Sequence, residues 1–205
     1  MADFSAKDVQ TLRQAAGVGM MDAKQALQEA GGDYDKAFQH LREKGLAKAA
    51  KRADREASEG AVGFYLHVQN DRPVVGVLVE LACETDFVAK SDEFKDAAND
   101  IALHVSWGNP RWITRDDVDA DELATERSIM ERQAAGEGKP ENVIPKIVEG
   151  RLEKFYQDTV LYDQTFVNPE KFEGTVGEMV AGLAAKMGEN ISVGRIERVA
   201  IGEGS

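Results

Sequence analysis

Apolar side chains in residues 1–45 recur at the spacing of amphipathic α-helices. The pattern predicts three short helices, whose inward positions include Val9, Leu12 and Ala16 in the first and Ala37, Phe38 and Leu41 in the third. Ser5 and Asp8 have the spacing of a capping box at the start of the first helix, with Asp in place of the usual Glu. Asp22 and Asp33 are expected to cap the second and third helices. A bundle of this size has a thin core, and such a domain usually binds another molecule rather than catalysing a reaction.

Beyond residue 60 the pattern changes to the alternation of β-strands. Residues 61–68 and 74–83 form two such runs, and the segment 70–73 between them, Asn-Asp-Arg-Pro, predicts a β-hairpin. One face of the second strand is entirely apolar and consists of Val75, Val77, Val79, Leu81 and Cys83. Helical spacing returns after Ser91, with helices predicted near 94–105, 121–134, 145–162 and 176–187 and a final strand at 191–201. This order predicts an α+β domain with a small three-stranded antiparallel sheet covered by helices.

A stretch rich in Ala, Lys and Arg separates the two patterns at residues 45–56. These residue types favour helix, and almost none is large enough to build a core, so we interpret the stretch as a solvated helical linker. Binding of RNA by this basic stretch is a weaker alternative, because the aromatic side chains for base stacking are missing. The predicted organisation is therefore an N-terminal module at 1–45, a helical linker at 46–58 and an α+β core at 59–205.

Composition narrows the function further. The chain has 205 residues, with 25 Lys and Arg against 37 Asp and Glu and a net charge of −12. This acidic balance argues against nucleic acid as a direct ligand, because phosphate binding needs clustered positive charge. The pattern predicts neither a membrane span nor a signal peptide. The single cysteine, Cys83, excludes an intramolecular disulfide and fits a reducing cytoplasm.

Residues that could catalyse a reaction or bind a metal are scattered. His40, His67 and His104 lie in different predicted elements without the spacing of metal ligands. Cys83 ends a strand on its apolar face and is interpreted as a small buried hydrophobe. No phosphate-binding or dinucleotide-binding loop is present in the sequence. We expect no catalytic residue, no metal site and no cofactor, and keep an enzyme that uses Cys83 or His67 as an alternative that a neutral Cys83→Ala change would exclude.

Two stretches break the local pattern. Met20 and Met21 follow Gly17-Val18-Gly19 and are predicted to lie on the loop between two helices. They either fill the bundle core or form an apolar surface for docking a protein, a use that suits the flexible methionine side chain.

The second stretch is Glu84–Lys90, between the buried strand and the amphipathic helix after Ser91. Thr85 and Asp86 can serve as turn and cap residues there. Phe87 either packs under the sheet or projects as an aromatic wedge toward a partner. The pattern leaves both alternatives open.

Three stretches resemble the family of bacterial elongation factor Ts. Residues 12–27 (LRQAAGVGMMDAKQAL) are similar to the family's N-terminal signature, and residues 80–90 (ELACETDFVAK) match its second signature. Residues 138–152 (GKPENVIPKIVEGRL) look like a later helix of the family. The resemblance covers essentially the whole chain in the same order. The departures from the first signature are Ala16, Val18 and Ala23, where the family commonly has Thr, Ala and Cys.

The resemblance implies a function in protein synthesis. Members of the family promote guanine-nucleotide exchange on elongation factor Tu, the GTPase that delivers aminoacyl-tRNA to the ribosome. Their Thr-Asp-Phe-Val motif displaces the Mg²⁺ bound to the partner, and by motif match this role falls on Thr85, Asp86, Phe87 and Val88. Their N-terminal module, a three-helix fold of the ubiquitin-associated type, docks on the partner's nucleotide-binding domain. That docking role falls on Arg13, Met20 and Met21.

The resemblance also implies a cytoplasmic protein that is not an enzyme, because nucleotide exchange makes and breaks no bond. The chain has room for one core subdomain, where many members have two and a protruding coiled coil. Such short forms tend to self-associate, so a homodimer that gives a 2:2 complex with elongation factor Tu is a hypothesis, and a bridge between chains through Cys83 stays open. The alternative is an adaptor for ubiquitin-like proteins joined to an unrelated interaction domain, which would act on no GTPase.

Overall fold

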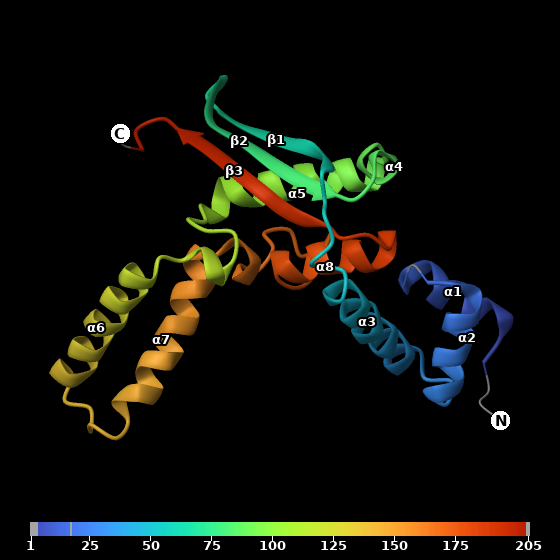
Figure 1. Cartoon of the computed structure of the whole chain (residues 1–205), viewed down its shortest axis with the longest axis horizontal. Coiled ribbons are helices and arrows are strands. Elements are labelled where there is room, and N and C mark those ends of the chain that lie inside the picture. The colour runs from blue at the N-terminus through green and yellow to red at the C-terminus, as the bar shows by residue number, and fades with distance from the viewer. Residues whose placement is uncertain (1–3, 17, 204–205) are drawn as a thin grey trace. The chain divides into compact units, whose positions relative to one another are not determined.

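The structure is a computed structural model that describes residues 4–16 and 18–203. Its elements, labelled in Figure 1, are α1 (Ala6–Ala16), α2 (Met20–Glu29), α3 (Tyr34–Ala50), β1 (Glu59–Gln69), β2 (Arg72–Cys83), α4 (Asp86–Ala89), α5 (Asp92–Gly108), η1 (Arg115–Asp117), α6 (Ala120–Gly136), α7 (Ile144–Thr159), η2 (Leu161–Asp163), α8 (Val176–Met187) and β3 (Ser192–Ala200). The chain forms two compact units. The first unit consists of Met1–Gly60, Ala82–Ser91 and Val180–Ser192, and the second of Ala61–Leu81, Asp92–Met179 and Val193–Ser205. The predicted α+β class is confirmed.

The first unit begins with a bundle of α1, α2 and α3. The buried core of the bundle consists of Val9, Leu12, Ala23, Ala26, Leu27, Ala37 and Leu41. The predicted capping box is present: the Ser5 N–H donates to the Asp8 carboxylate at 2.7 Å, and the Asp8 N–H donates to the Ser5 hydroxyl at 3.2 Å. Asp33 caps α3 as predicted, because its carboxylate accepts a hydrogen bond from the Lys36 N–H at 3.1 Å. Helix α3 continues to Ala50, and turns follow it.

The start of α2 differs from the sequence prediction. The N-cap is Gly19, both Met20 and Met21 lie in the first turn of the helix, and Asp22 is its third residue. The placement of the methionines on a loop and of Asp22 at the cap is therefore wrong. A carboxylate in the first turn also stabilises the positive end of the helix dipole, so the residue type alone does not distinguish the two positions. Gly17, which the pattern places at the end of the first helix, lies outside the described residues.

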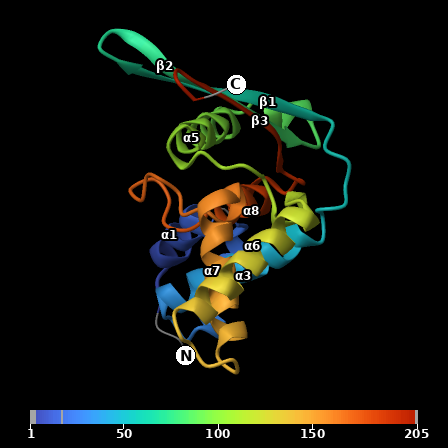
Figure 2. The same ribbon diagram turned by 90° about the vertical axis from the view of Figure 1, so that its left-hand side faces the viewer.

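In the second unit β1, β2 and β3 form one antiparallel sheet with β2 in the centre, and α5 runs along one face of it (Figures 1 and 2). A two-residue turn joins β1 to β2, since Asn70 and Asp71 have positive φ angles of 51° and 59°. The turn is shorter than predicted, because Pro73 lies inside β2, near its start where a proline is tolerated. The apolar face predicted for the second strand is confirmed, with Val77, Val79, Leu81 and Cys83 buried and Val75 partly buried.

The packing of α5 against the sheet requires a glycine in β1. A Cβ atom added at Gly63 would lie 2.2 Å from the backbone C and O atoms of Ala98 in α5. Beside it the Phe64 N–H donates a hydrogen bond to the Asn99 side-chain oxygen at 3.0 Å. The fully buried apolar side chains of α5 are Phe94, Ala98, Ile101, Ala102 and Val105. The sheet and α5 therefore approach closely enough to share one core.

A buried histidine and glutamine connect α5 to the chain after η2. His104 is 2% exposed, and its Nδ1 accepts a hydrogen bond from the Val167 N–H at 3.1 Å. Because Nδ1 accepts, Nε2 carries the proton and donates to the Gln164 side-chain oxygen at 2.9 Å, so the ring is neutral. The Gln164 amide group donates in turn to the carbonyls of Gly108 and Asp158 at 2.9 and 3.0 Å. Burial lowers the pKa of His104 from its ordinary value.

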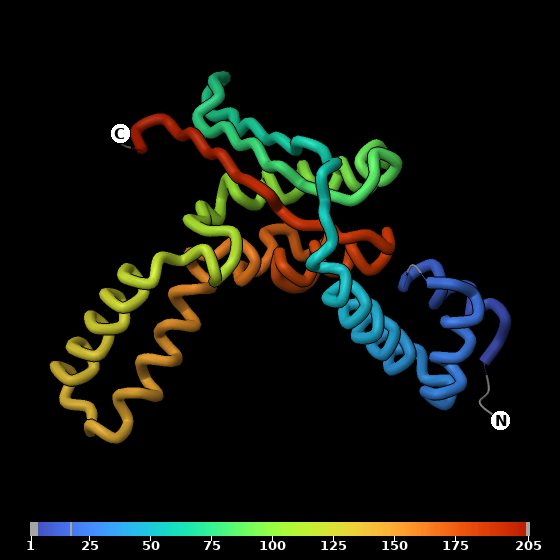
Figure 3. The backbone as a smooth tube through the Cα atoms, in the orientation of Figure 1, coloured from blue at the N-terminus to red at the C-terminus, as the bar shows by residue number. Residues whose placement is uncertain are grey.

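Helices α6 and α7 form an antiparallel hairpin, and Figure 3 follows the chain along α6 and back along α7. This confirms the two helices predicted near 121–134 and 145–162. The second one ends at Thr159, earlier than predicted, because Val160 leaves the helix and pairs with Trp112 in a β-bridge. The apolar period of the sequence cannot show where α7 ends, because Val160 would be an inward-facing residue of a longer helix and is also buried in the β-bridge.

We predict that Gly63→Ala destabilises the protein by about 2 kcal/mol or more, because the backbone of Ala98 must move to admit the new Cβ. The matched control is Gly150→Ala in α7, where an added Cβ meets nothing within 4 Å. That change is expected to stabilise the helix by about 0.5–1 kcal/mol. Urea unfolding measures both effects, and equal stabilities of the two variants would contradict the packing of α5 on β1.

The neutral state of His104 predicts a pH dependence of stability. Its pKa is lowered from 6.5 in the folded protein, so the unfolded chain binds the proton more tightly. The stability contributed by the neutral His104 ring is therefore complete at pH values above the ordinary histidine pKa of 6.5, and it falls as the pH drops below about 6.5. Urea unfolding between about pH 7.5 and pH 5.5 tests this. An NMR titration in which His104 protonates at or above its ordinary pKa would contradict the proton assignment.

Candidate functional site

Strand β2 ends at Cys83, and the chain then forms the one-turn helix α4. Thr85 is its N-cap, with extended backbone angles and a side-chain oxygen that accepts a hydrogen bond from the Val88 N–H at 3.4 Å. The sequence predicts the capping role of Thr85 but not the helical turn, because four residues are too few to show a period. We call residues Glu84–Lys90 the 84–90 segment.

The side chains of α4 divide into a buried and an exposed group. Val88 and Ala89 are 6% and 8% exposed. Phe87 is 81% exposed, a larger fraction than for the other large apolar side chains of the described residues. The structure thus places the Phe87 ring outside the core, which was one of the two alternatives left by the sequence. An aromatic ring presented in this way is suited to insertion into a protein partner.

The 84–90 segment is held by Glu189, a residue that the sequence pattern does not single out. The Glu189 carboxylate accepts hydrogen bonds from the Glu84 N–H at 3.0 Å, the Thr85 N–H at 3.1 Å and the Thr85 hydroxyl at 2.6 Å. Gly188 directs the chain to this position: its φ angle is 77°, and its N–H bonds to the Ala184 carbonyl where α8 ends. A helix-ending glycine before an acidic residue is the only trace of this contact in the sequence, and it does not identify the partner.

Asn190 adds a second set of contacts at the same place. Its N–H donates to the Glu84 side chain at 2.6 Å, and its side-chain amide donates to the carbonyls of Ala53 and Arg55 at 3.1 and 2.7 Å. The Arg55 guanidinium lies 3.4 Å from the same Glu84 oxygen. Three segments that are far apart in the sequence are therefore joined within the first unit.

Two exposed charged side chains of the 84–90 segment pair with each other. Asp86 and Lys90, one turn apart, form an ion pair of 2.5 Å that lowers the pKa of Asp86 and raises the pKa of Lys90. Both side chains are exposed, so the pair contributes little to stability. The buried Cys83 thiol donates to the Thr85 carbonyl at 3.2 Å, and burial raises its pKa. Cys83 is thus a protonated donor within the site rather than a thiolate.

The residues predicted for docking lie where α1 ends and α2 begins. Arg13 is exposed in the last turn of α1, and its carbonyl accepts a hydrogen bond from the Val18 N–H at 3.3 Å. Met20 and Met21 are 49% and 74% exposed, so neither fills the bundle core. Exposed methionines of this kind adapt readily to an apolar partner surface.

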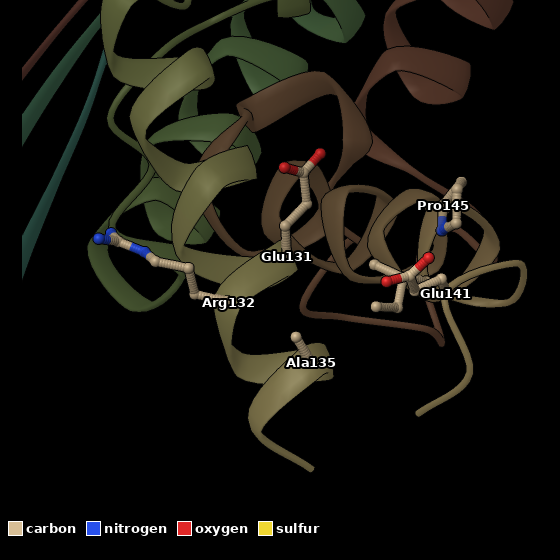
Figure 4. A pocket seen from close by; sticks show the side chains of 6 residues that line it. Glu131, Arg132, Ala135, Glu141 and Pro145 are labelled. Atoms are coloured by element: carbon tan, nitrogen blue, oxygen red, sulfur yellow. The ribbon is translucent and has the colours of Figure 1, made fainter. Parts of the chain in front are cut away.

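The remaining candidates for chemistry are not brought together. The described residues contain no group of three or more His, Cys, Asp or Glu side chains that could hold a metal ion. A shallow hollow between the end of α6 and the start of α7 is lined by Glu131, Arg132, Ala135, Glu141, Ile144 and Pro145 (Figure 4). In it Arg132 points away from Glu131 and Glu141, so the polar groups do not converge (Figure 4). In residues 4–16 and 18–203, no helix is both long and apolar enough to cross a membrane.

An exposed ring on an anchored turn, together with an exposed methionine pair on a helical bundle, is typical of a protein that works by docking on another protein. Comparison with known proteins gives the family. The family described as "Elongation factor TS" matches residues 3–180. Elongation factor Ts of Fervidobacterium nodosum is 49% identical over 201 residues, which cover 98% of this chain and 100% of the relative. The protein of the same name from Desulforamulus reducens is 47% identical over 204 residues, 100% of this chain and 92% of the relative. The chain belongs to the elongation factor Ts family.

Proposed function

We propose that this protein is the guanine-nucleotide exchange factor of elongation factor Tu and promotes GDP release during translation. Its membership of the elongation factor Ts family supports the partner and the type of process. The observation that carries the proposal is Phe87, 81% exposed on a helical turn whose backbone is anchored. Exchange makes and breaks no covalent bond, so the protein acts as a binding factor without a cofactor of its own rather than as an enzyme. Its place of action is the cytoplasm, where translation elongation takes place.

The target of the exposed ring is the Mg²⁺ ion in the partner's nucleotide site. Mg²⁺ requires near-octahedral coordination at about 2.0–2.1 Å and bridges phosphate oxygens to protein ligands. A phenylalanine ring that enters between the elements lining such a site moves them apart, and the coordination is lost. In this mechanism Phe87 is the inserted group, Thr85 and Val88 set its direction as cap and buried anchor, and Asp86 lies beside it at the surface.

Exchange by this route has no built-in direction. If binding of this protein weakens GDP binding to the partner, GDP weakens the binding of this protein by the same factor. The cellular concentrations of GTP and GDP therefore decide which nucleotide enters. Arg13, Met20 and Met21 supply the second contact, which keeps the two proteins together while the nucleotide site is empty.

We predict that Phe87→Ala reduces the acceleration of GDP release at least about tenfold, because an aromatic anchor carries about 2 kcal/mol or more of interface energy. Stopped-flow release of a fluorescent GDP analogue from elongation factor Tu measures the effect. Because the ring is exposed, the melting temperature of the variant should equal that of the wild type.

The control for this experiment is Val143→Ala, which removes a partly exposed apolar side chain from the second unit and should leave the exchange rate unchanged. No acceleration by the wild type would overturn the proposed function and favour the adaptor alternative. Acceleration that survives intact in Phe87→Ala would keep the function and remove Phe87 from the mechanism.

The outer face of the sheet supports self-association. The apolar side chains on the face opposite α5 are Val62, Phe64, Leu66, Val68 and Leu78, each 52–63% exposed. They form a continuous row across β1 and β2, because alternate strand residues point to the same side. Glu80 continues the row and lies 3.8 Å from the Arg195 side chain, so the face carries both signs of charge. A two-fold axis through such a face would bring the apolar rows of two copies together and allow the Glu80 carboxylate of each copy to face a guanidinium of the other, which supports a homodimer and a 2:2 complex with elongation factor Tu.

Phe64→Asp should weaken this dimer at least about a hundredfold, because pairing would bury an uncompensated carboxylate. Sedimentation velocity of both proteins over a range of concentrations measures the change. Val143→Asp, which places the same charge outside the sheet, serves as the control. A wild type that sediments as a monomer at the highest concentration would exclude the dimer.

A further inference from the structure

Phe87 can push the elements of a partner apart only if the turn that carries it does not yield. An isolated helical turn has no stability of its own, because helix nucleation is unfavourable and so few hydrogen bonds follow it. Helix α4 has four residues, so it must be held by contacts from other parts of the chain.

The Glu189 carboxylate provides such contacts where the segment begins. It accepts from two consecutive backbone N–H groups, those of Glu84 and Thr85, at 3.0 and 3.1 Å. Hydrogen bonds to an ionised acceptor are about twice as strong as neutral ones. One side chain thus fixes the direction in which the backbone leaves β2.

The Thr85 hydroxyl extends this support into α4. It donates to Glu189 at 2.6 Å, and its oxygen accepts from the Val88 N–H at 3.4 Å. The proton of the hydroxyl is therefore directed toward Glu189, which leaves an oxygen lone pair for the helix cap. Phe87 lies between these two bonded residues, so the same chain of contacts sets the direction of its side chain.

The base of this support is itself fixed. Gly188 turns the chain out of α8, and Asn190 bonds to the Glu84 side chain and to the carbonyls of Ala53 and Arg55. Glu189 therefore lies between two anchored neighbours, which limits the positions that its carboxylate can reach.

We propose that Glu189 is a positioning residue for nucleotide exchange, which holds the Glu84–Thr85 backbone and the Thr85 hydroxyl so that Phe87 projects from a rigid turn. Glu189 acts through Phe87 and makes no contact with nucleotide or Mg²⁺ in this role. The proposal rests on the proposed function and deepens it by naming the residue that makes the wedge rigid.

The test is Glu189→Gln, alone and combined with Phe87→Ala, in the stopped-flow assay with elongation factor Tu. Glutamine keeps the size of the side chain but replaces one acceptor oxygen by a donor that faces other donors. The maximal rate of GDP release at saturating protein should fall about fivefold to tenfold, while the half-saturating concentration changes less than about twofold. In the Phe87→Ala background the second change should have no further effect, because the group that Glu189 positions is gone.

Amide hydrogen exchange gives a measure that does not depend on the partner. Glu189→Gln should accelerate exchange at Thr85 and Val88 without lowering the melting temperature of the whole protein. Glu178→Gln is the matched control, because the Glu178 carboxylate makes a similar bond to the Thr175 N–H at 3.0 Å at the start of α8. This control should change neither the rate of GDP release nor the hydrogen-exchange rates of the amides in the 84–90 segment.

Three results would overturn the positioning role of Glu189, and they can be told apart. A loss of rate in Glu189→Gln that persists in the Phe87→Ala background would show a general structural role and overturn the positioning role. An unchanged maximal rate in Glu189→Gln, with Phe87→Ala defective, would overturn it while keeping the proposed function. If Phe87→Ala itself is fully active, the wedge mechanism fails and the positioning role of Glu189 fails with it. The Phe87→Ala variant alone is enough to recognise this result.

Discussion

The end of the central strand is the constraint on which the candidate site depends. One face of β2 is buried as far as Cys83, and the chain then leaves the sheet with the backbone N–H groups of Glu84 and Thr85 turned toward a new acceptor. These two N–H groups are partly or fully open to water, so the exit of the chain is fixed by the direction of the charge-assisted hydrogen bonds that another segment offers them. Glu189 supplies the acceptor, and it lies in the short connection between the end of α8, where Gly188 turns the chain, and the start of β3 at Ser192. An exposed turn can therefore follow directly after a strand whose inner face is buried to its last residue.

The two faces of the sheet serve different purposes. The inner face is apolar and covered by α5, and Gly63 permits the close approach of the two backbones. The outer face is also apolar, from Val62 to Leu78, but α5 does not cover it. A contiguous exposed apolar surface of this kind is unusual for a protein that remains a monomer. The sheet thus contributes one face to the core of the second unit, while the apolar side chains of its other face stay exposed.

Periodic elements could be predicted from the sequence, and contacts between distant segments could not. The alternation in β2 and the helical period in α5 are sufficient to predict both elements, because each is long enough to establish which side is buried. The sequence pattern misplaces the cap of α2, because Gly19 and Asp22 are both acceptable residues near a helix start. The 84–90 segment stands out in the sequence pattern and the role of Phe87 is implied by the resemblance, but the choice between a packed and a projecting ring stays open in the sequence, since α4 is too short to show a period. The contact of Glu189 with Thr85 spans 104 residues, and the local sequence pattern around either residue does not predict it.

A rigid turn at Phe87 would help an exchange factor to meet two conditions at once, which are tight binding to the partner and release when the next nucleotide binds. An exchange factor must bind the partner tightly enough to displace a nucleotide, yet it must leave when the next nucleotide binds. Each flexible group that becomes ordered on binding reduces the affinity, so a wedge that is already in position loses less of its interaction energy. A ring that is 81% exposed before binding also makes few contacts that must be broken first. In the proposed mechanism the free energy of inserting Phe87 is then available to disturb the metal site rather than to order the 84–90 segment, which gives a physical reason for anchoring the backbone of the turn and leaving the ring itself exposed.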